Sequence, residues 1–135
     1  MISKKNILVT GANGQLGNEC KVLSAQYKDS NFVFTDVEEL SITDVVAIDE
    51  IFSKNNFDYC INAAAYTAVD NAEKDEDLSR TINATAVGYL ANACKKYNCR
   101  LIHISTDYVF DGENSIGYNE DDATAPINVY GSTKL

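Results

Sequence analysis

Tyr130 and Lys134 stand four residues apart in the stretch NVYGSTKL. Residues at this spacing share one face of a helix. A free tyrosine, with a pKa of about 10, is a poor acid–base catalyst at neutral pH, but a nearby ammonium stabilises the phenolate and lowers that pKa. The pair therefore predicts proton transfer by Tyr130 with help from Lys134. A solvated helix pair without chemistry is the alternative interpretation.

Thr106 adds weight to the catalytic interpretation because it directly follows a predicted strand at 101–105. Ligands of open α/β sheets bind at the carboxyl ends of the strands. A threonine hydroxyl at that place can hydrogen-bond a substrate carbonyl. A simple cap at the end of the strand is the alternative for Thr106.

The stretch TGANGQLG sets Gly11, Gly14 and Gly17 between a predicted strand and a predicted helix. Glycines in this context allow a tight turn, close approach of the backbone to a pyrophosphate, and close packing of the helix on the sheet. The start of the helix also favours an anionic phosphate. We therefore expect a dinucleotide to bind here, and plain turn glycines are the alternative.

Asp36 closes the second predicted strand, after the glycine loop. A carboxylate at this place can accept hydrogen bonds from the adenosine ribose and would repel a 2′-phosphate, which favours NAD. An ordinary acidic turn residue is the alternative.

Strand and helix patterns alternate along the chain, and the strands are continuously apolar, which predicts a parallel sheet covered on both faces. We expect an α/β fold, a doubly wound Rossmann-type sheet of order 3-2-1-4-5 that is truncated after the fifth strand. Residues 1–135 would form one dinucleotide-binding domain. Strands are predicted at 6–10, 31–36, 38–42 (very short), 59–63 and 101–105, and helices at 15–28, 43–56 with Thr43 as N-cap, 78–97 and from 128.

Composition excludes several classes of protein. A net charge of −9 without a basic stripe argues against nucleic-acid binding. Apolar runs are too short for a membrane span or a secretory signal, so we expect a cytoplasmic protein. The four cysteines form no C-x-x-C pair and read as reduced, with three in or near the core. His103, the single histidine, is expected to be a packed core residue, so no metal site is predicted.

The stretches TGANGQLG, NAAAYTAVDNAE, STDYVFDG and NVYGSTK occur in this order along the whole chain. With them the sequence resembles the extended short-chain dehydrogenase/reductase superfamily, and within it the dTDP-4-dehydrorhamnose reductases. The resemblance implies cofactor contacts from the following residues: Gly11, Gly14, Gln15, Leu16, Gly17, Asp36, Ser41, Ile42, Ala63, Ala64, Ala65, Tyr66, Thr67, Tyr130 and Lys134. Ser41 and Ile42 depart from the Asp-hydrophobic pair that the family often has there.

The resemblance also implies a reaction. Thr106 and Asp107 would face the sugar, Tyr130 would protonate the C4 oxygen as the nicotinamide delivers hydride to C4, and Lys134 would tune Tyr130 and hold the ribose. The intact enzyme would reduce dTDP-4-dehydro-L-rhamnose to dTDP-L-rhamnose with NADH or NADPH, and a homodimer stays open as its assembly.

Two other functions remain open. One is a nucleotide-sugar epimerase or dehydratase of the same superfamily, which recycles tightly held NAD. The other is a non-catalytic NAD(P)-binding regulatory subunit, such as the reductase-like subunit of methionine adenosyltransferase. Because family members are much longer and their C-terminal part grips the nucleotide sugar, we expect this chain to be an N-terminal portion with little activity. Residues 128–135 are then expected to be frayed, displaced or held only by a neighbouring molecule.

Overall fold

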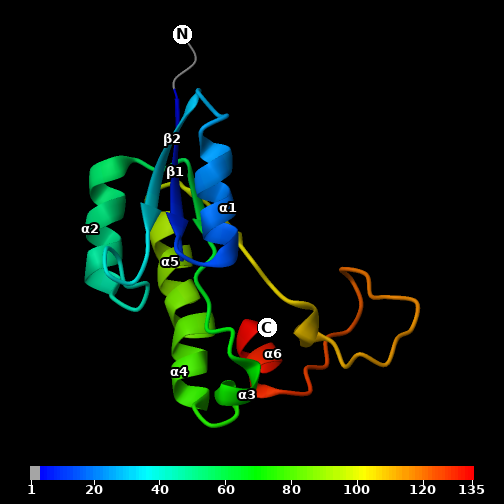
Figure 1. The fold of residues 1–135 in the computed structure, drawn as a ribbon. Coiled ribbons are helices and arrows are strands. Elements are labelled where there is room, and N and C mark those ends of the chain that lie inside the picture. Colours follow the sequence, from blue (N-terminus) through cyan, green and yellow to red (C-terminus); the bar gives the residue numbers. More distant parts are fainter. Residues whose placement is uncertain (1–3) are drawn as a thin grey trace.

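The computed structural model describes residues 4–135, and its centre is one parallel sheet (Figure 1). The strand order is β2-β1-β3-β4. The strands are β1 Lys5–Thr10, β2 Ser30–Thr35, β3 Tyr59–Asn62 and β4 Arg100–His103. The doubly wound α/β fold class that the sequence predicts is confirmed.

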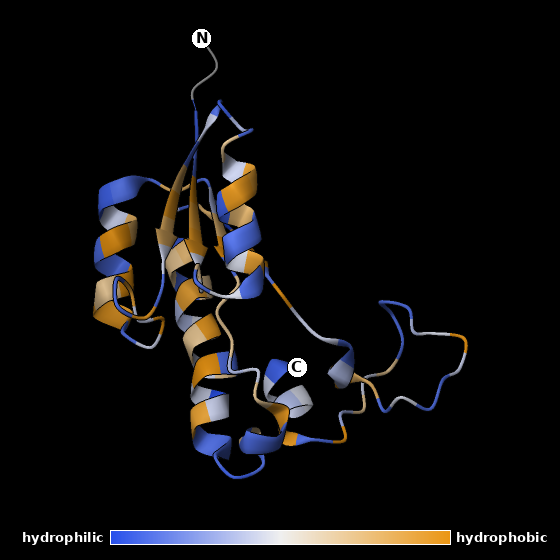
Figure 2. Ribbon diagram, viewed as in Figure 1, coloured by the Kyte–Doolittle hydropathy of each residue, from blue (hydrophilic) through white to orange (hydrophobic). Residues whose placement is uncertain are grey.

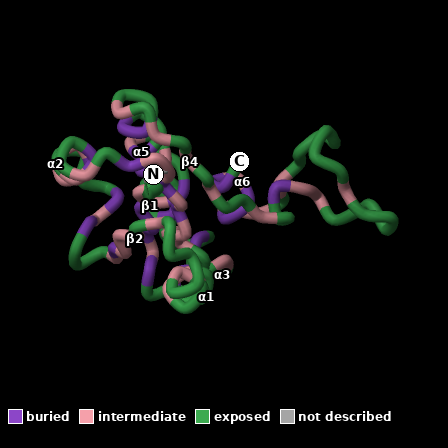
Figure 3. The backbone as a smooth tube through the Cα atoms, turned by 90° about the horizontal axis from the view of Figure 1, so that it is seen from above, coloured by how far each residue is buried: buried purple, intermediate pink, exposed green. Residues whose placement is uncertain are grey.

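Helices cover both faces of the sheet. Helix α1 (Gln15–Ser24) lies on one face, and α2 (Val45–Asn55) and α5 (Ala86–Lys96) lie on the other (Figures 1 and 3). The elements α4 (Glu76–Arg80) and η1 (Thr81–Thr85) lead directly into α5, and the short elements α3 (Val69–Ala72), η2 (Asp107–Val109) and α6 (Val129–Lys134) lie beyond the carboxyl edge of the sheet. Within residues 4–135 no helix combines the length and the apolar character that crossing a membrane requires.

The main core lies between the sheet and the α2–α5 pair, where the strands and the inward helix faces are apolar (Figure 2). Leu8, Ile48, Phe52 and Leu90 are fully buried there. The ring of Phe52 meets that of Phe57 edge-on, with centroids 5.5 Å apart. Each such side chain contributes about 1.5–3 kcal/mol through burial, so this layer holds the sheet and the helices in register.

Cys60 and Cys94 belong to this core and Cys99 packs against it, so the prediction of three cysteines in or near the core is confirmed. Cys60 and Cys94 are buried, whereas Cys20 and Cys99 are partly exposed, and all four are free thiols. The hydrogen bond with Cys94, followed by burial, raises the pKa of the Cys60 thiol. Burial raises the pKa of Cys99 to about 12. Cys60 and Cys99 are therefore held in their protonated, less reactive form, whereas the hydrogen bond with Cys60 lowers the pKa of the Cys94 thiol.

The predicted strand at 38–42 is wrong, and with it the outermost position of the order 3-2-1-4-5. The chain turns instead, because the Asp36 carbonyl accepts hydrogen bonds from the backbone N–H groups of Glu39 and Leu40 at 3.1 and 2.8 Å. Leu40 and Ile42 alternate as in a strand, but both are buried in the α2 side of the core. The alternation reflects this anchoring, and no strand within residues 4–135 pairs with the segment.

The expectation of a frayed or displaced 128–135 segment is also wrong. Asn128 caps α6 by accepting a hydrogen bond from the backbone N–H of Gly131 at 2.7 Å. As whole residues, Thr133 and Lys134 are 2% and 7% exposed. Polar contacts with neighbouring elements hold this short helix, although its few turns would be marginal alone.

The segment 110–127, by contrast, extends away from the body of the molecule (Figure 3). Its two ends are joined by a hydrogen bond from the Ala125 N–H to the Val109 carbonyl oxygen at 2.9 Å, and the rings of Phe110 and Tyr118 stack within it, with centroids 4.3 Å apart. This segment contributes little to the core, since most of its residues are exposed.

Helix α2 is capped by Asp44 and not by the predicted Thr43, because the Asp44 carboxylate accepts from the N–H groups of Val46 and Ala47, each at 3.0 Å. We expect Asp44→Ala to lower the free energy of unfolding by about 1 kcal/mol, the usual value of an N-cap. Thr43→Ala is the matched control, since the Thr43 hydroxyl contacts only the Ser41 hydroxyl. Denaturant unfolding measures both, and a larger loss for Thr43→Ala would contradict the assignment.

Candidate active site

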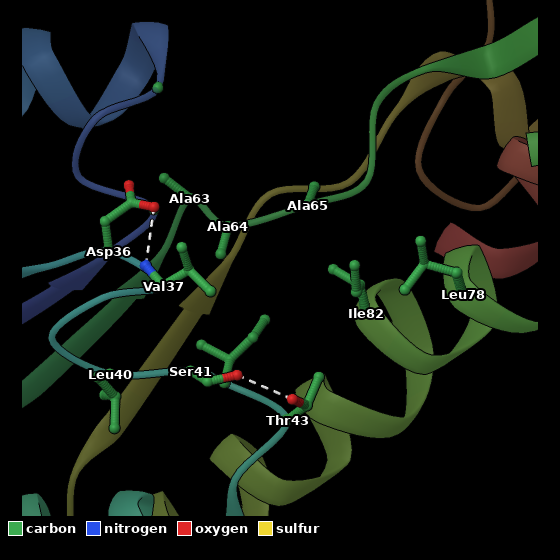
Figure 4. Close-up of a pocket in the computed structure, with 13 residues that line it drawn as sticks. Asp36, Val37, Leu40, Ser41, Thr43, Ala63, Ala64, Ala65, Leu78 and Ile82 are labelled. Atoms are coloured by element: carbon green, nitrogen blue, oxygen red, sulfur yellow. Dashed lines mark hydrogen bonds between the residues drawn. The ribbon is translucent and has the colours of Figure 1, made fainter. Parts of the chain in front are cut away.

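A pocket of about 460 Å³ opens at the carboxyl edge of the sheet (Figure 4). Sequence-predicted cofactor residues form much of its wall: Gly11, Gly14, Asp36, Ser41, Ile42, Ala63, Ala64 and Ala65. The sequence predicted these cofactor contacts separately in three segments. The structure brings the three segments together around one pocket.

Five further lining residues were missed by sequence reasoning: Val37, Leu40, Thr43, Leu78 and Ile82. Leu78 and Ile82 belong to a run of apolar residues at helical spacing. Such spacing is as typical of residues buried in a core as of residues that line a ligand pocket. Figure 4 shows both side chains on the helix across the pocket from Asp36. They give the pocket an apolar side opposite its carboxylate.

The three loop glycines differ in what the fold itself requires of them. Gly11 has a φ of +65°, and a side-chain carbon there would overlap the backbone of Ala63 and Ala64. A side-chain carbon on Gly17 would overlap the backbone of Gly11 and Ala12. At Gly14 it would meet only the Gly11 carbonyl oxygen, at 3.3 Å. Gly14 thus leaves open backbone beside the pocket, which suits the approach of a pyrophosphate.

Asp36 ties the glycine loop to the end of β2. Its carboxylate accepts from the backbone N–H of Asn13 and from that of Val37, each at 2.8 Å. An ionised carboxylate offers about four acceptor positions, so two remain for ribose hydroxyls. The residues present therefore fit the adenosine half of a nicotinamide dinucleotide.

A buried polar chain crosses the carboxyl edge of the sheet. Asn62 accepts from the Thr10 hydroxyl at 2.6 Å and from the Ala64 N–H at 3.2 Å. Its amide nitrogen lies 3.1 Å from His103 Nδ1. Burial, and then the charge of Lys134, lowers the pKa of His103. A neutral imidazole that accepts at Nδ1 fits this environment, consistent with the predicted packed role of His103.

Tyr130 and Lys134 lie on α6, outside the wall of the pocket. Lys134 Nζ donates to the Ile104 carbonyl oxygen at 2.6 Å, and burial lowers the pKa of its ammonium. The Tyr130 ring is buried and meets the Tyr108 ring edge-on, with centroids 5.6 Å apart. Helix α6 thus carries both predicted catalytic groups at the end of β4.

Thr106 caps η2 in this structure. Its hydroxyl accepts from the Tyr108 N–H and donates to the Asp107 carboxylate, each at 3.2 Å. Thr106 therefore acts as a cap after β4, which is the alternative that the sequence left open. Its predicted contact with substrate stays a prediction, as does that of the exposed Asp107.

Gln15, Leu16, Gly17, Tyr66 and Thr67 do not line the pocket. Gln15, Leu16 and Gly17 begin α1, and Tyr66 is held through its backbone by Asn83. Their predicted cofactor contacts stay predictions. Among residues 4–135 no group of three or more His, Cys, Asp or Glu side chains is arranged to hold a metal ion.

Gly131, inside the Y-x-x-x-K stretch, was missed by sequence reasoning. A side-chain carbon there would overlap the Tyr108 carbonyl group and approach Pro126 Cβ at 3.1 Å. The glycine therefore lets α6 pack directly on the η2 backbone. A glycine within a predicted helix was the available signal, because it lowers helix propensity and so needs a packing reason.

Comparison with known proteins gives a consistent family. The model of the RmlD substrate binding domain matches residues 5–135. A dTDP-4-dehydrorhamnose reductase of Burkholderia thailandensis is 44% identical over 129 residues, which cover 96% of this chain and 43% of that protein.

Solved structures agree with the sequence comparison. The dTDP-4-dehydrorhamnose reductase of Bacillus anthracis, in complex with NADP, superposes with a TM-score of 0.92 at 38% identity, covering 97% of this chain and 46% of that one. The Clostridium acetobutylicum enzyme gives 0.91 at 43% identity, covering 96% and 46%. The chain thus spans less than half the length of these relatives.

The glycine geometry generates a first binding prediction. We expect Gly14→Val to abolish NADH binding and to leave the fold intact, because the added carbons obstruct the phosphate approach but meet little of the protein. Gly88→Ala is the control, since nothing lies within 4 Å of a side-chain carbon there. Titration calorimetry and circular dichroism check both variants. Wild-type affinity in Gly14→Val would exclude the loop as the phosphate site.

The carboxylate generates a second binding prediction. Asp36→Ala should weaken NADH by about 10-fold or more, the loss expected for hydrogen bonds to a charged group. NADPH should lose less, because the same change removes a charge that repels its 2′-phosphate. Calorimetric titration with each dinucleotide measures the two losses, and Glu38→Ala is the control for removing an exposed charge nearby. Equal losses, or a larger one for NADPH, would overturn the ribose role of Asp36.

Proposed function

The chain belongs to the RmlD substrate binding domain family, and from this we propose that the protein carrying it reduces dTDP-4-dehydro-L-rhamnose to dTDP-L-rhamnose with NADH or NADPH. The relatives named dTDP-4-dehydrorhamnose reductase support this reaction, and one of them was solved with NADP. The observation that carries the proposal is the position of Tyr130 and Lys134, on a packed helix at the carboxyl edge where a dinucleotide pocket opens. A nucleotide-sugar substrate and a cytoplasmic location belong to the same proposal.

The pocket would bind the dinucleotide in an extended form. Asp36 accepts from the ribose hydroxyls at one end. Gly14 carries no side chain that would obstruct the pyrophosphate, and the Ala63–Ala65 segment supports the remainder. The small alanine side chains leave room for a flat ring system beside the backbone. The reduced nicotinamide supplies the hydride that C4 of the sugar accepts.

Residues of α6 and η2 complete the reaction. The Tyr130 hydroxyl gives its proton to the C4 oxygen, which becomes the alcohol of the product. The Lys134 ammonium stabilises the phenolate that this leaves, and solvent returns the proton. Thr106 would orient the substrate carbonyl with its hydroxyl. Lys134 is already held by the Ile104 carbonyl at 2.6 Å, so little side-chain freedom is lost when substrate binds.

Tyr130→Phe should lower kcat by about 10²–10⁴-fold, the usual contribution of a general acid, with little change in NADH affinity. The assay follows loss of NADH absorbance with dTDP-4-dehydro-L-rhamnose in the protein that carries this sequence. Tyr108→Phe is the control, because it keeps the ring that packs on Tyr130.

Retained activity in Tyr130→Phe would reject Tyr130 as the acid. A wild-type protein that keeps bound NAD through purification and interconverts sugars without net NADH loss would instead favour the epimerase alternative.

A further inference from the structure

Asp36 suits only one of the two cofactors that the proposed function allows. Its carboxylate can accept from the ribose hydroxyls of NADH, but it would repel the 2′-phosphate of NADPH. The segment after Asp36 offers no compensating charge, since it reads Val37, Glu38 and Glu39. The pocket wall, as far as the structure describes it, contains no lysine or arginine either. A cation that neutralises the 2′-phosphate must therefore come from the other side of Asp36, where the glycine loop leads into α1 (Figure 4).

Lys21 extends from the body of α1 to this place. Its Nζ donates to the side-chain oxygen of Asn13, eight residues earlier in the chain, at 2.9 Å. Helical side chains lean toward the amino end of their helix, which explains how a lysine well inside α1 contacts the loop before it. Lys21 is partly buried, so its aliphatic stem lies along the protein while its ammonium stays at the surface.

Asn13 connects this ammonium to the Asp36 carboxylate. Its backbone N–H donates to Asp36 Oδ2 at 2.8 Å, while its side-chain oxygen accepts from Lys21. Its carbonyl oxygen accepts from Asn18 Nδ2 at 3.0 Å, so three hydrogen bonds hold this loop residue in place. The carboxylate and the ammonium thus contact one and the same residue. A phosphate on a ribose oxygen beside Asp36 would lie within reach of the flexible lysine side chain.

The charge of Lys21 is available to a ligand. Within residues 4–135 none of the ion pairs includes it, and its partner Asn13 is a neutral amide. An ammonium has three donors, and the bond to Asn13 uses one of them. The other lysines of the first 60 residues lie elsewhere: Lys4 and Lys5 at the amino end of β1, Lys28 beyond the end of α1, and Lys54 in an ion pair on α2.

We propose that Lys21 is the specificity-determining residue that admits NADPH, by exchanging its hydrogen bond with Asn13 for one with the 2′-phosphate. The inference rests on the proposed function, from which it takes the nicotinamide dinucleotide. With NADH, Lys21 stays on Asn13 and Asp36 accepts from the ribose hydroxyls. With NADPH, the ammonium gives up a neutral amide oxygen and gains a charged phosphate oxygen, which is the stronger partner. This gain offsets the repulsion by Asp36, so one site serves both dinucleotides.

Lys21→Gln tests the assignment, because it removes the charge and keeps a polar side chain at a surface position. We expect the dissociation constant of NADPH to rise about 10-fold, as for loss of a charge-assisted contact near the surface, and that of NADH to stay within about 2-fold. Lys21→Arg keeps the charge and should keep NADPH binding. Lys28→Gln is the matched control, since it removes the same charge from an exposed position beyond α1. Calorimetric titration of each variant with each dinucleotide gives the constants.

A second measurement uses the adenosine half of the cofactor alone. Adenosine 2′,5′-bisphosphate and adenosine 5′-monophosphate differ only in the 2′-phosphate, and neither carries a nicotinamide. In NMR titrations Lys21→Gln should weaken binding of the bisphosphate about 10-fold and leave binding of the monophosphate within about 2-fold.

The outcomes separate the position of Lys21 from its charge and from the reaction. Equal losses for NADH and NADPH in Lys21→Gln, or no loss for NADPH, would overturn the role of Lys21. An equal loss of NADPH binding in Lys28→Gln would overturn it too, because the net charge and not the position would then decide. If the bisphosphate responds as stated while the wild-type protein reduces no dTDP-4-dehydro-L-rhamnose, the reductase function fails and the 2′-phosphate site stands.

Discussion

The hydrogen bonds of the fully buried Asn62 side chain constrain the positions of the strand ends that form the site. An unpartnered amide at that depth would cost about 1–3 kcal/mol, so its hydrogen bonds are obligatory. They run to the Thr10 hydroxyl, the Ala64 N–H and the His103 ring. In meeting them, Asn62 fixes the ends of three strands at one level and directs the chain after β3 along the wall of the pocket. The close approach of Gly11 to Ala64 depends on the same path.

The molecule contains two kinds of packing, an apolar core on one face of the sheet and a hydrogen-bonded polar region around α6. The face toward α2 and α5 is apolar and supplies stability, with Phe52 and Leu90 at its centre. The region around α6 is joined by hydrogen bonds between buried polar groups, and each adds only about 0.5–1.5 kcal/mol net. Within residues 4–135 no buried side-chain nitrogen or oxygen lacks a hydrogen-bond partner. Polar packing of this kind fixes the orientation of an element more than it adds to stability. This suits α6, whose Tyr130 and Lys134 side chains must be held in defined positions.

The sequence predicted the features that depend on local patterns, above all the cofactor residues at the ends of strands. The glycine loop, Asp36 and the alanines at 63–65 follow strands directly, and carboxyl ends of parallel strands meet at one edge. Local pattern failed where tertiary structure decides. Leu40 and Ile42 alternate like a strand but anchor a turn, and Thr43 and Asp44 are adjacent residues of equal capping type. The Asn83–Thr133 bond joins positions 50 apart, and a π turn is invisible to a period of 3.6.

The buried thiols give the molecule an internal reporter. Cys60 is 0% exposed and Cys94 is 3% exposed, on the stable α2–α5 side of the sheet, whereas Cys20 on α1 is partly exposed. Alkylation needs both contact with reagent and a thiolate, and the pKa of Cys60 is raised by its bond to Cys94 and by burial. A reagent therefore meets Cys20 in the native protein and Cys60 only in molecules whose sheet has parted from α5. The ratio of the Cys60 to the Cys20 labelling rate therefore measures how often the sheet separates from α5. This measurement needs no ligand or substrate.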